Sequence, residues 1–202
     1  AVPMLIDAIL NTEDGDLAGY LEAIATIGPG AIPGLIQALA DKDANAAPAL
    51  IAALAKIGVP AIEPLTEAMA GNAEMRDAAM GALKQIGAPA IEALTQTLLH
   101  DSRFEMRGRA LEILKDIGDG MIVPLLVDAL AEDDSAVRLN AIRYMGELGD
   151  ADAVRPLIQV LHTAADLSLQ RAALASLGAI GNIQDIQPLL EALENPSLRD
   201  VA

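Results

Sequence analysis

The side chains best suited to chemistry in this sequence are carboxylates and amides that recur at intervals of about thirty residues. They occupy one position of the interval, and a second polar position lies one helical turn earlier. The first position holds Asp7, Gln37, Glu67, Gln96, Asp128, Gln159 and Glu191, and the second holds Glu63, Glu92, Arg155 and Gln187. If the repeats stack, these side chains form one stripe that suits a basic or amide-rich protein segment. An ordinary solvated helix face is the alternative interpretation.

Arginine recurs at another repeat position, in the first turn of a predicted helix. The position holds Arg76, Arg107, Arg138 and, near the end of the sequence, Arg199. A cation there opposes the helix dipole, so a compensating acceptor is expected. The candidates are the carboxylates of Asp101 and Asp134 or a free carbonyl at the end of the preceding helix. We interpret these arginines as a structural ladder between repeats. Phosphate binding is the alternative, which the acidic surroundings oppose.

No catalytic, cofactor or metal site is predicted. The chain has no cysteine, which removes thiol nucleophiles and thiolate metal ligands. His100 and His162 occupy one repeat position but lie two repeats apart, about 20 Å if stacking is regular, so they cannot share a metal ion. His100, Asp101 and Ser102 are the residue types of a catalytic triad, but neighbours in sequence do not give triad geometry. The acidic turns lack the ligand spacing of a calcium loop.

Composition narrows the classes of partner. The chain has 202 residues, 53% of them hydrophobic, and a formal net charge of −16. It contains one Phe, two Tyr and no Trp, so a surface for stacking bases is not expected. The negative charge argues against nucleic acid and anionic membranes, and the apolar run at 44–55 is too short for membrane insertion. The expected partner is another protein or protein segment, and a basic one fits the charge.

An aliphatic residue followed by glycine marks each repeat. The glycines are Gly28, Gly58, Gly87, Gly118, Gly149 and Gly181. Apolar residues four and seven positions before each glycine define one face of a first helix, which the glycine ends in the left-handed conformation. Ser102 to Glu105 fits a capping box at the start of one such helix.

A second helix follows each glycine. The predicted ranges are 31–40, 61–70, 90–99, 121–131, 153–162 and 186–193. Proline occurs in the first turn of most of them, where the missing N–H has no intrahelical partner to lose. Leucines such as Leu35, Leu65 and Leu94 lie on the face opposite the polar stripe, so the sequence predicts that they form the core.

The sequence therefore predicts an all-α fold, a right-handed α-solenoid of about six stacked helix-pair repeats in one domain spanning 1–202. The predicted repeats are 11–41, 42–71, 72–101, 102–133, 134–163 and 164–195. Residues 1–10 match 31–40 as the second helix of a truncated repeat, and 196–202 begin a further one, so we expect a segment of a longer protein. No targeting segment occurs within the sequence. The compartment is left open, with the cytoplasm as the default expectation.

The run at 137–161, VRLNAIRYMGELGDADAVRPLIQVL, resembles a HEAT-like repeat of the phycobilisome-lyase type. The pattern recurs with losses at 75–98, 106–130 and 169–193 and is weaker in the first two units. The resemblance implies a non-catalytic scaffold whose second helices present a concave acid- and amide-lined surface to a protein partner. One branch of the family implies the alternative, a subunit of a bilin-lyase-like enzyme that acts with a second chain. The acidic stripe and the scarcity of aromatics oppose a tetrapyrrole with its propionates.

Overall fold

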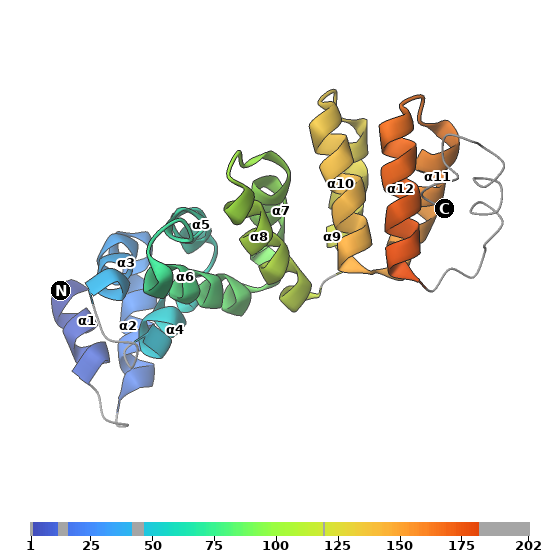
Figure 1. Ribbon diagram of the computed structural model, residues 1–202. Coiled ribbons are helices and arrows are strands. Elements are labelled where there is room, and N and C mark those ends of the chain that lie inside the picture. Colours follow the sequence, from blue (N-terminus) through green and yellow to red (C-terminus); the bar gives the residue numbers. More distant parts are fainter. Residues whose placement is uncertain (1, 12–15, 42–46, 119, 182–202) are drawn as a thin grey trace. The chain divides into compact units, whose positions relative to one another are not determined.

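The computed structural model describes residues 2–11, 16–41, 47–118 and 120–181, and these form α-helices and short 3-10 turns without a strand (Figure 1). The helices up to the middle of the chain are α1 (Val2–Asn11), α2 (Leu17–Ile27), α3 (Ile32–Asp41), α4 (Ala47–Ile57), α5 (Ile62–Ala68), α6 (Ala73–Ile86), α7 (Ile91–His100) and α8 (Phe104–Ile117). They are followed by α9 (Ile122–Asp128), α10 (Ser135–Leu148), α11 (Val154–Thr163) and α12 (Leu167–Ile180). The predicted all-α fold is confirmed.

The glycine that ends each first helix has a positive φ, but the predicted left-handed helical conformation occurs only at Gly118, Gly149 and Gly181. The other three, Gly28, Gly58 and Gly87, have ψ angles between −134° and −136°. The φ angles of the repeat glycines lie between 61° and 75°, in the region that only glycine adopts at little cost. The N–H of Gly87, for example, donates to the carbonyl of Leu83 and so satisfies a free acceptor at the helix end. Short 3-10 turns that begin at or just after the glycine then lead into α3, α5, α7 and α11. The aliphatic-Gly motif therefore correctly predicted where the first helix of each pair ends.

The starts of the first helices are set by side-chain caps, with one departure from the prediction. The side chains of Asn72, Asp134 and Asp166 each accept a hydrogen bond from a backbone N–H in the first turn of α6, α10 and α12, respectively. The capping box expected at Ser102 is wrong, because α8 has Arg103 at its N-cap with no side-chain cap. The carboxylate of Asp101 instead accepts the N–H and the guanidinium of Arg103, which fixes the turn before the helix.

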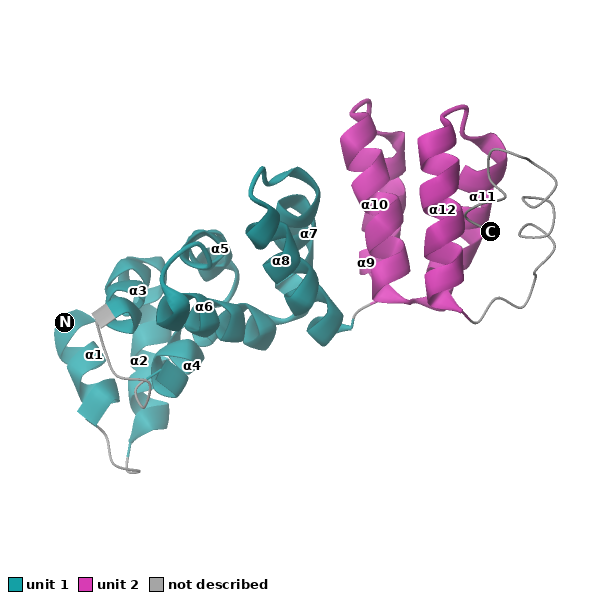
Figure 2. Cartoon of the chain, in the orientation of Figure 1, with its two compact units in different colours: residues 1–118 teal, residues 119–202 magenta. Residues whose placement is uncertain are grey.

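The chain divides into two compact units, residues 1–118 (unit 1) and 119–202 (unit 2), shown separately in Figure 2. In unit 1 the first helices α2, α4, α6 and α8 contact one another in succession and form one layer, the first-helix layer. The second helices α1, α3, α5 and α7 do the same and form the second-helix layer. In unit 2, α12 packs against both α10 and α11. Stacked helix pairs of this kind are the construction of an α-solenoid.

The core lies where the predicted apolar faces meet. In the second helices of unit 1, Leu35, Leu65 and Leu94 are completely buried, as is Leu157 in unit 2. The first helices contribute equally buried side chains at the predicted spacing, such as Leu83 in α6. Each helix thus buries one face against its neighbours and leaves the other face to solvent.

One apolar run, Leu17–Ala40, is long enough to pass for a membrane span by length and composition. It comprises α2, a 3-10 turn and α3, and the positive φ of Gly28 separates the two α-helices. In the next repeat the corresponding segments, Ala47–Ile57 and Val59–Ala68, bend by 118° at the glycine. Ile24 and Leu35 within the run are completely buried among neighbouring helices. Packing within the repeats therefore accounts for part of the apolar composition, since 33% of the apolar window is buried.

Several predictions fall outside the described residues. These are the helix at 186–193 with Gln187 and Glu191, the partial repeat 196–202 and Arg199. The repeat boundaries and the single domain over 1–202 stay predictions.

Candidate binding surface on the second helices

The predicted stripe lies on the solvent face of the second helices. Every member that the structure describes is exposed to solvent. The leucines on the opposite face of the same helices, such as Leu35, Leu65 and Leu94, are buried. In unit 1 these exposed residues are Asp7, Gln37, Glu63, Glu67, Glu92 and Gln96, and in unit 2 they are Asp128, Arg155 and Gln159. Because α1, α3, α5 and α7 contact one another in succession, the unit 1 members belong to one surface. Their role as a binding stripe stays a prediction.

Charge is segregated between the two layers of unit 1. In the described part of this unit the second helices carry no Lys or Arg at all, and their carboxylates include Glu63, Glu67 and Glu92. The Lys and Arg residues of the same part lie on α4, α6 and α8 or at the N-cap of α8. Along the sequence no such separation is evident, because residues 1–100 and residues 101–202 have the same net charge. The separation becomes visible only when residues are sorted by helix layer.

The two layers also differ in how their carboxylates are compensated. On the first helices Glu22 pairs with Lys56 across α2 and α4. Lys84 in α6 contacts Asp116 at 2.6 Å and Glu112 at 3.3 Å in α8. The hydrogen bond that Lys84 donates to Asp116 is the main reason why the pKa of Lys84 is raised above its usual value, and the bond to Glu112 adds to it. These pairs cancel charge locally between neighbouring repeats.

Four carboxylates of the second helices in the described part of unit 1 have no such partners. Within the residues that the structure describes, the side chains of Asp7, Glu63, Glu67 and Glu92 make no hydrogen bond or ion pair. Glu63 and Glu67 are four residues apart on the same face of α5, where like charges repel each other. An arriving cation would relieve this repulsion, so the second-helix layer is suited to bind positive charge.

Two grooves lie between successive second helices, one in each unit. In unit 1 a groove of about 640 Å³ between α3 and α5 is lined mainly by apolar side chains, among them Pro33, Ile36 and Pro64. Two stripe residues, Gln37 and Glu67, complete its lining. The volume of this groove and that of the unit 2 groove, described next, both fall within the range of small-ligand sites.

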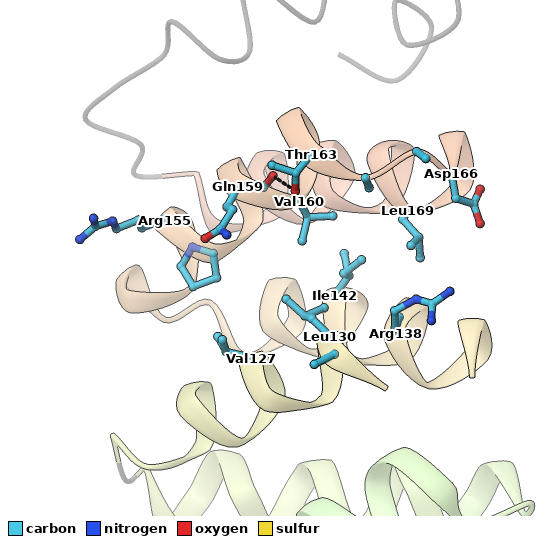
Figure 3. Close-up of a pocket in the computed structure, with 14 residues that line it drawn as sticks. Val127, Leu130, Arg138, Ile142, Arg155, Gln159, Val160, Thr163, Asp166 and Leu169 are labelled. Carbon is cyan, nitrogen blue, oxygen red and sulfur yellow. Dashed lines mark hydrogen bonds between the residues drawn. The ribbon is translucent and has the colours of Figure 1, made fainter. Parts of the chain in front are cut away.

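The groove in unit 2 has a volume of about 670 Å³ and involves α9, α10, α11 and the start of α12. Leu130 and Ile142 project into it from one side and Val160 and Leu169 from the other, whereas Arg155 extends away from it (Figure 3). Gln159, a stripe residue, also lines this groove. The two grooves therefore share an apolar interior but differ in the charges around it.

Two arginines of the predicted ladder, Arg107 and Arg138, donate to backbone carbonyls. Arg107 donates from Nη1 to the carbonyl of Asp101 at 2.7 Å, and Arg138 donates to the carbonyls of Glu132 and Asp133. Of the two kinds of acceptor expected, the carbonyl after the preceding helix is therefore the one used. Arg107 also lies over the ring of Phe104, 5.6 Å from its centroid.

Arg76 departs from this pattern, and Arg109 supplies a contact that sequence reasoning missed. Arg76 pairs with its neighbour Asp77 at 2.9 Å. Arg109, in α8, donates to the carbonyl of Met69, at the end of α5. The contact joins residues forty positions apart, so no local pattern could have revealed it.

The pairs of stacked helices define a class of protein, the α-solenoids. Models of HEAT repeats match residues 32–115, 91–168 and 123–202, and the chain belongs to the HEAT repeat family. HEAT repeats generally serve as scaffolds for protein interaction. No curated protein matches the sequence.

Several solved structures are similar over nearly the whole chain. Human deoxyhypusine hydroxylase in complex with glycerol has 19% identity and a TM-score of 0.44, and the match covers 99% of this chain and 92% of that one. An engineered protein has 22% identity and a TM-score of 0.40, with 98% and 92% covered. A designed armadillo repeat protein in complex with the peptide (KR)4 has 17% identity and a TM-score of 0.35, with 89% and 99% covered. At these scores the likenesses say nothing about activity or partners.

Proposed function

We propose that the chain is a non-catalytic scaffold whose second-helix layer in unit 1 binds a basic segment of a partner protein. The observation that carries the proposal is the set of exposed carboxylates, Glu63, Glu67 and Glu92 among them, for which the described residues of unit 1 place no Lys or Arg on the same layer. On the first helices, by contrast, Glu22, Glu112 and Asp116 are paired with lysines of neighbouring helices. A surface that leaves its charges uncompensated steers an oppositely charged partner to itself and aligns it.

Neutralising these carboxylates should weaken the binding of a basic peptide. The test compares the triple variant Glu63→Gln, Glu67→Gln and Glu92→Gln with the wild-type chain, using a fluorescent peptide of alternating Lys and Gly in an anisotropy titration. Three exposed charge contacts at a few tenths to one kcal/mol each predict a loss of about tenfold in affinity. Binding to the wild-type chain should also weaken as salt rises, since the Debye length is about 8 Å at physiological ionic strength.

A matched control changes the net charge equally on the other layer. Glu22→Gln, Glu112→Gln and Asp116→Asn together remove three carboxylates from the first helices, where they pair with Lys56 and Lys84. This control should reduce peptide affinity much less than the second-helix variant. Equal losses of peptide affinity in both variants would mean that only the overall charge matters and would contradict the proposal.

The bilin-lyase alternative stays a prediction. Neither groove between second helices has an aromatic side chain in its lining. Visible absorbance acquired by the purified protein on mixing with a tetrapyrrole would favour this alternative over the scaffold.

A further inference from the structure

We propose that the groove between α3 and α5 is the anchor for the partner segment and that it takes an aliphatic side chain flanked by Lys or Arg. The inference rests on the proposed function, since the groove lies in the second-helix layer of unit 1. It specifies where on this layer the partner segment binds. It also requires an aliphatic side chain in that segment, which charge alone would not.

The interior of the groove suits an aliphatic side chain. Pro33 and Pro64 lie in the first turns of α3 and α5, and Pro29 and Pro60 lie in the 3-10 turns before them. Helix starts normally expose N–H groups that hold water, but proline has none. With Ile36 beside them, these rings form a wall that offers water little to bind, so an apolar group can displace it at small cost.

The edge of the groove supplies the requirement for a cation. Glu67 lines the groove, and its exposed carboxylate makes no hydrogen bond or ion pair among the described residues. A Lys or Arg next to the anchoring side chain could lay its methylene stem on the proline rings while its charged end reaches the carboxylate. The volume of about 640 Å³ exceeds one aliphatic side chain and leaves room for such a stem.

The groove of unit 2 shows which features are particular to the anchor. Aligning the two pairs of repeats places Val127 at the position of Ile36, Pro156 at that of Pro64 and Gln159 at that of Glu67. Both grooves thus have apolar walls, although Pro156 is the only counterpart of the four prolines in the unit 2 lining. The carboxylate becomes an uncharged amide, and the lining gains Arg138 and Arg155 against a single acid, Asp166.

Asp166 already has partners, because its carboxylate accepts the N–H and the hydroxyl of Ser168 at 2.8 and 2.6 Å. A basic segment therefore finds a free carboxylate in the unit 1 groove, whereas in unit 2 it meets two arginines. This difference makes the unit 2 groove a built-in control for the experiment.

The test uses two peptides of alternating Lys and Gly that differ only at the central residue, Leu in one and Ser in the other. The Leu peptide should bind the wild-type chain about tenfold more tightly, the effect expected for burying one aliphatic side chain. Ile36→Ser should abolish this preference, and Val127→Ser, the matched change in the unit 2 groove, should leave it intact. Circular dichroism establishes that both variants are folded.

A cross-linking measurement keeps the test decisive if Ile36→Ser fails to fold. A photoreactive leucine at the centre of the peptide should attach to residues 29–37 or 60–75 of the wild-type chain, as read by mass spectrometry. Attachment only elsewhere overturns the anchor.

The remaining outcomes separate the two proposals. Equal affinity for both peptides, with loss of binding in the Glu63, Glu67 and Glu92 variant, overturns the anchor and leaves the proposed function standing. An equal effect of Ile36→Ser and Val127→Ser also overturns the anchor. Failure of both peptides to bind the wild-type chain overturns both proposals.

Discussion

Arg107, Arg138 and Gln170 stand at the same repeat position, and each donates a hydrogen bond to a carbonyl six residues earlier. The bond from Gln170 Nε2 to the carbonyl of Ala164 measures 2.9 Å. Since an uncharged amide occupies the position in α12, the position requires a donor that reaches the carbonyl after the preceding helix. A positive charge there is not essential.

Replacing the donor should therefore cost stability in proportion to the hydrogen bond that is lost. Arg107→Ala should lower the free energy of unfolding by about 1–3 kcal/mol, the scale for bonds to charged groups. Arg107→Gln should lose less, about 1 kcal/mol or under, because Gln170 makes the same contact. Urea denaturation followed by circular dichroism measures both. Equal losses for Ala and Gln would show that the stem of the arginine, or its contact with Phe104, matters more than the bond.

Asp101 shows how local chemistry can override a sequence motif. The pKa of the Asp101 carboxyl is lowered mainly by hydrogen bonds from the side chain of Arg103, and the backbone N–H of Arg103 contributes as well. α8 takes Arg103, and not Ser102, as its N-cap. For this reason the capping box, which was predicted from residue types alone, did not form.

At the scale of the helix pair, the repeat glycine is the element that turns the chain. Gly87 has a φ of 72°, and a Cβ built there would meet only the carbonyl of Lys84 at an ordinary 3.9 Å. The need for glycine is therefore conformational and not steric. Gly108, in the middle of α8, has no positive φ and nothing within 4 Å of an added Cβ.

The same substitution should act in opposite directions at these two glycines. Gly87→Ala should destabilise the chain by about 1–3 kcal/mol, because a φ of 72° with a ψ of −135° is a sparsely populated conformation for any residue other than glycine. Gly108→Ala should stabilise it by about 0.5–1 kcal/mol, since alanine restricts the unfolded chain and favours the helix. Thermal unfolding of the two variants beside wild type measures the difference. Stabilisation by both would contradict the role assigned to Gly87.

These elements were predictable where the signal was local. The repeat glycines with positive φ, the prolines in the first turns and the buried leucines such as Leu65 follow from short-range rules, and the structure confirms them. The contact between Arg109 and Met69 and the grooves between second helices depend on how neighbouring repeats pack. Spacing along the chain does not contain that information. The stripe was predicted, but the lack of partners for its carboxylates could be seen only in three dimensions.

At the scale of the molecule, unit 1 holds two complete layers of helices and its own buried core. In repeat proteins stability comes from each repeat and its contacts with the next, so such a block can stand without distant repeats. Residues 1–118 produced alone should therefore fold and unfold cooperatively, with a helical circular dichroism spectrum.

A shorter fragment provides the control. One that ends at Asp101 removes α8, which packs against α7 and α6, and should be markedly less stable. If residues 1–118 were unfolded in solution, the compact unit would not be an independent block.

The segregation of charge in unit 1 has a practical consequence for measuring its interactions. The lysine amines in its described part belong to Lys56, Lys84 and Lys115, all on first helices. Coupling through these three amines attaches the first-helix layer to a sensor chip or a dye, whereas coupling through Lys42, the residue after α3 in the sequence, would not. Carbodiimide activation would consume the stripe carboxylates together with those of the first helices, so an arginine in place of Lys42 and amine coupling are the conditions that spare the surface under study.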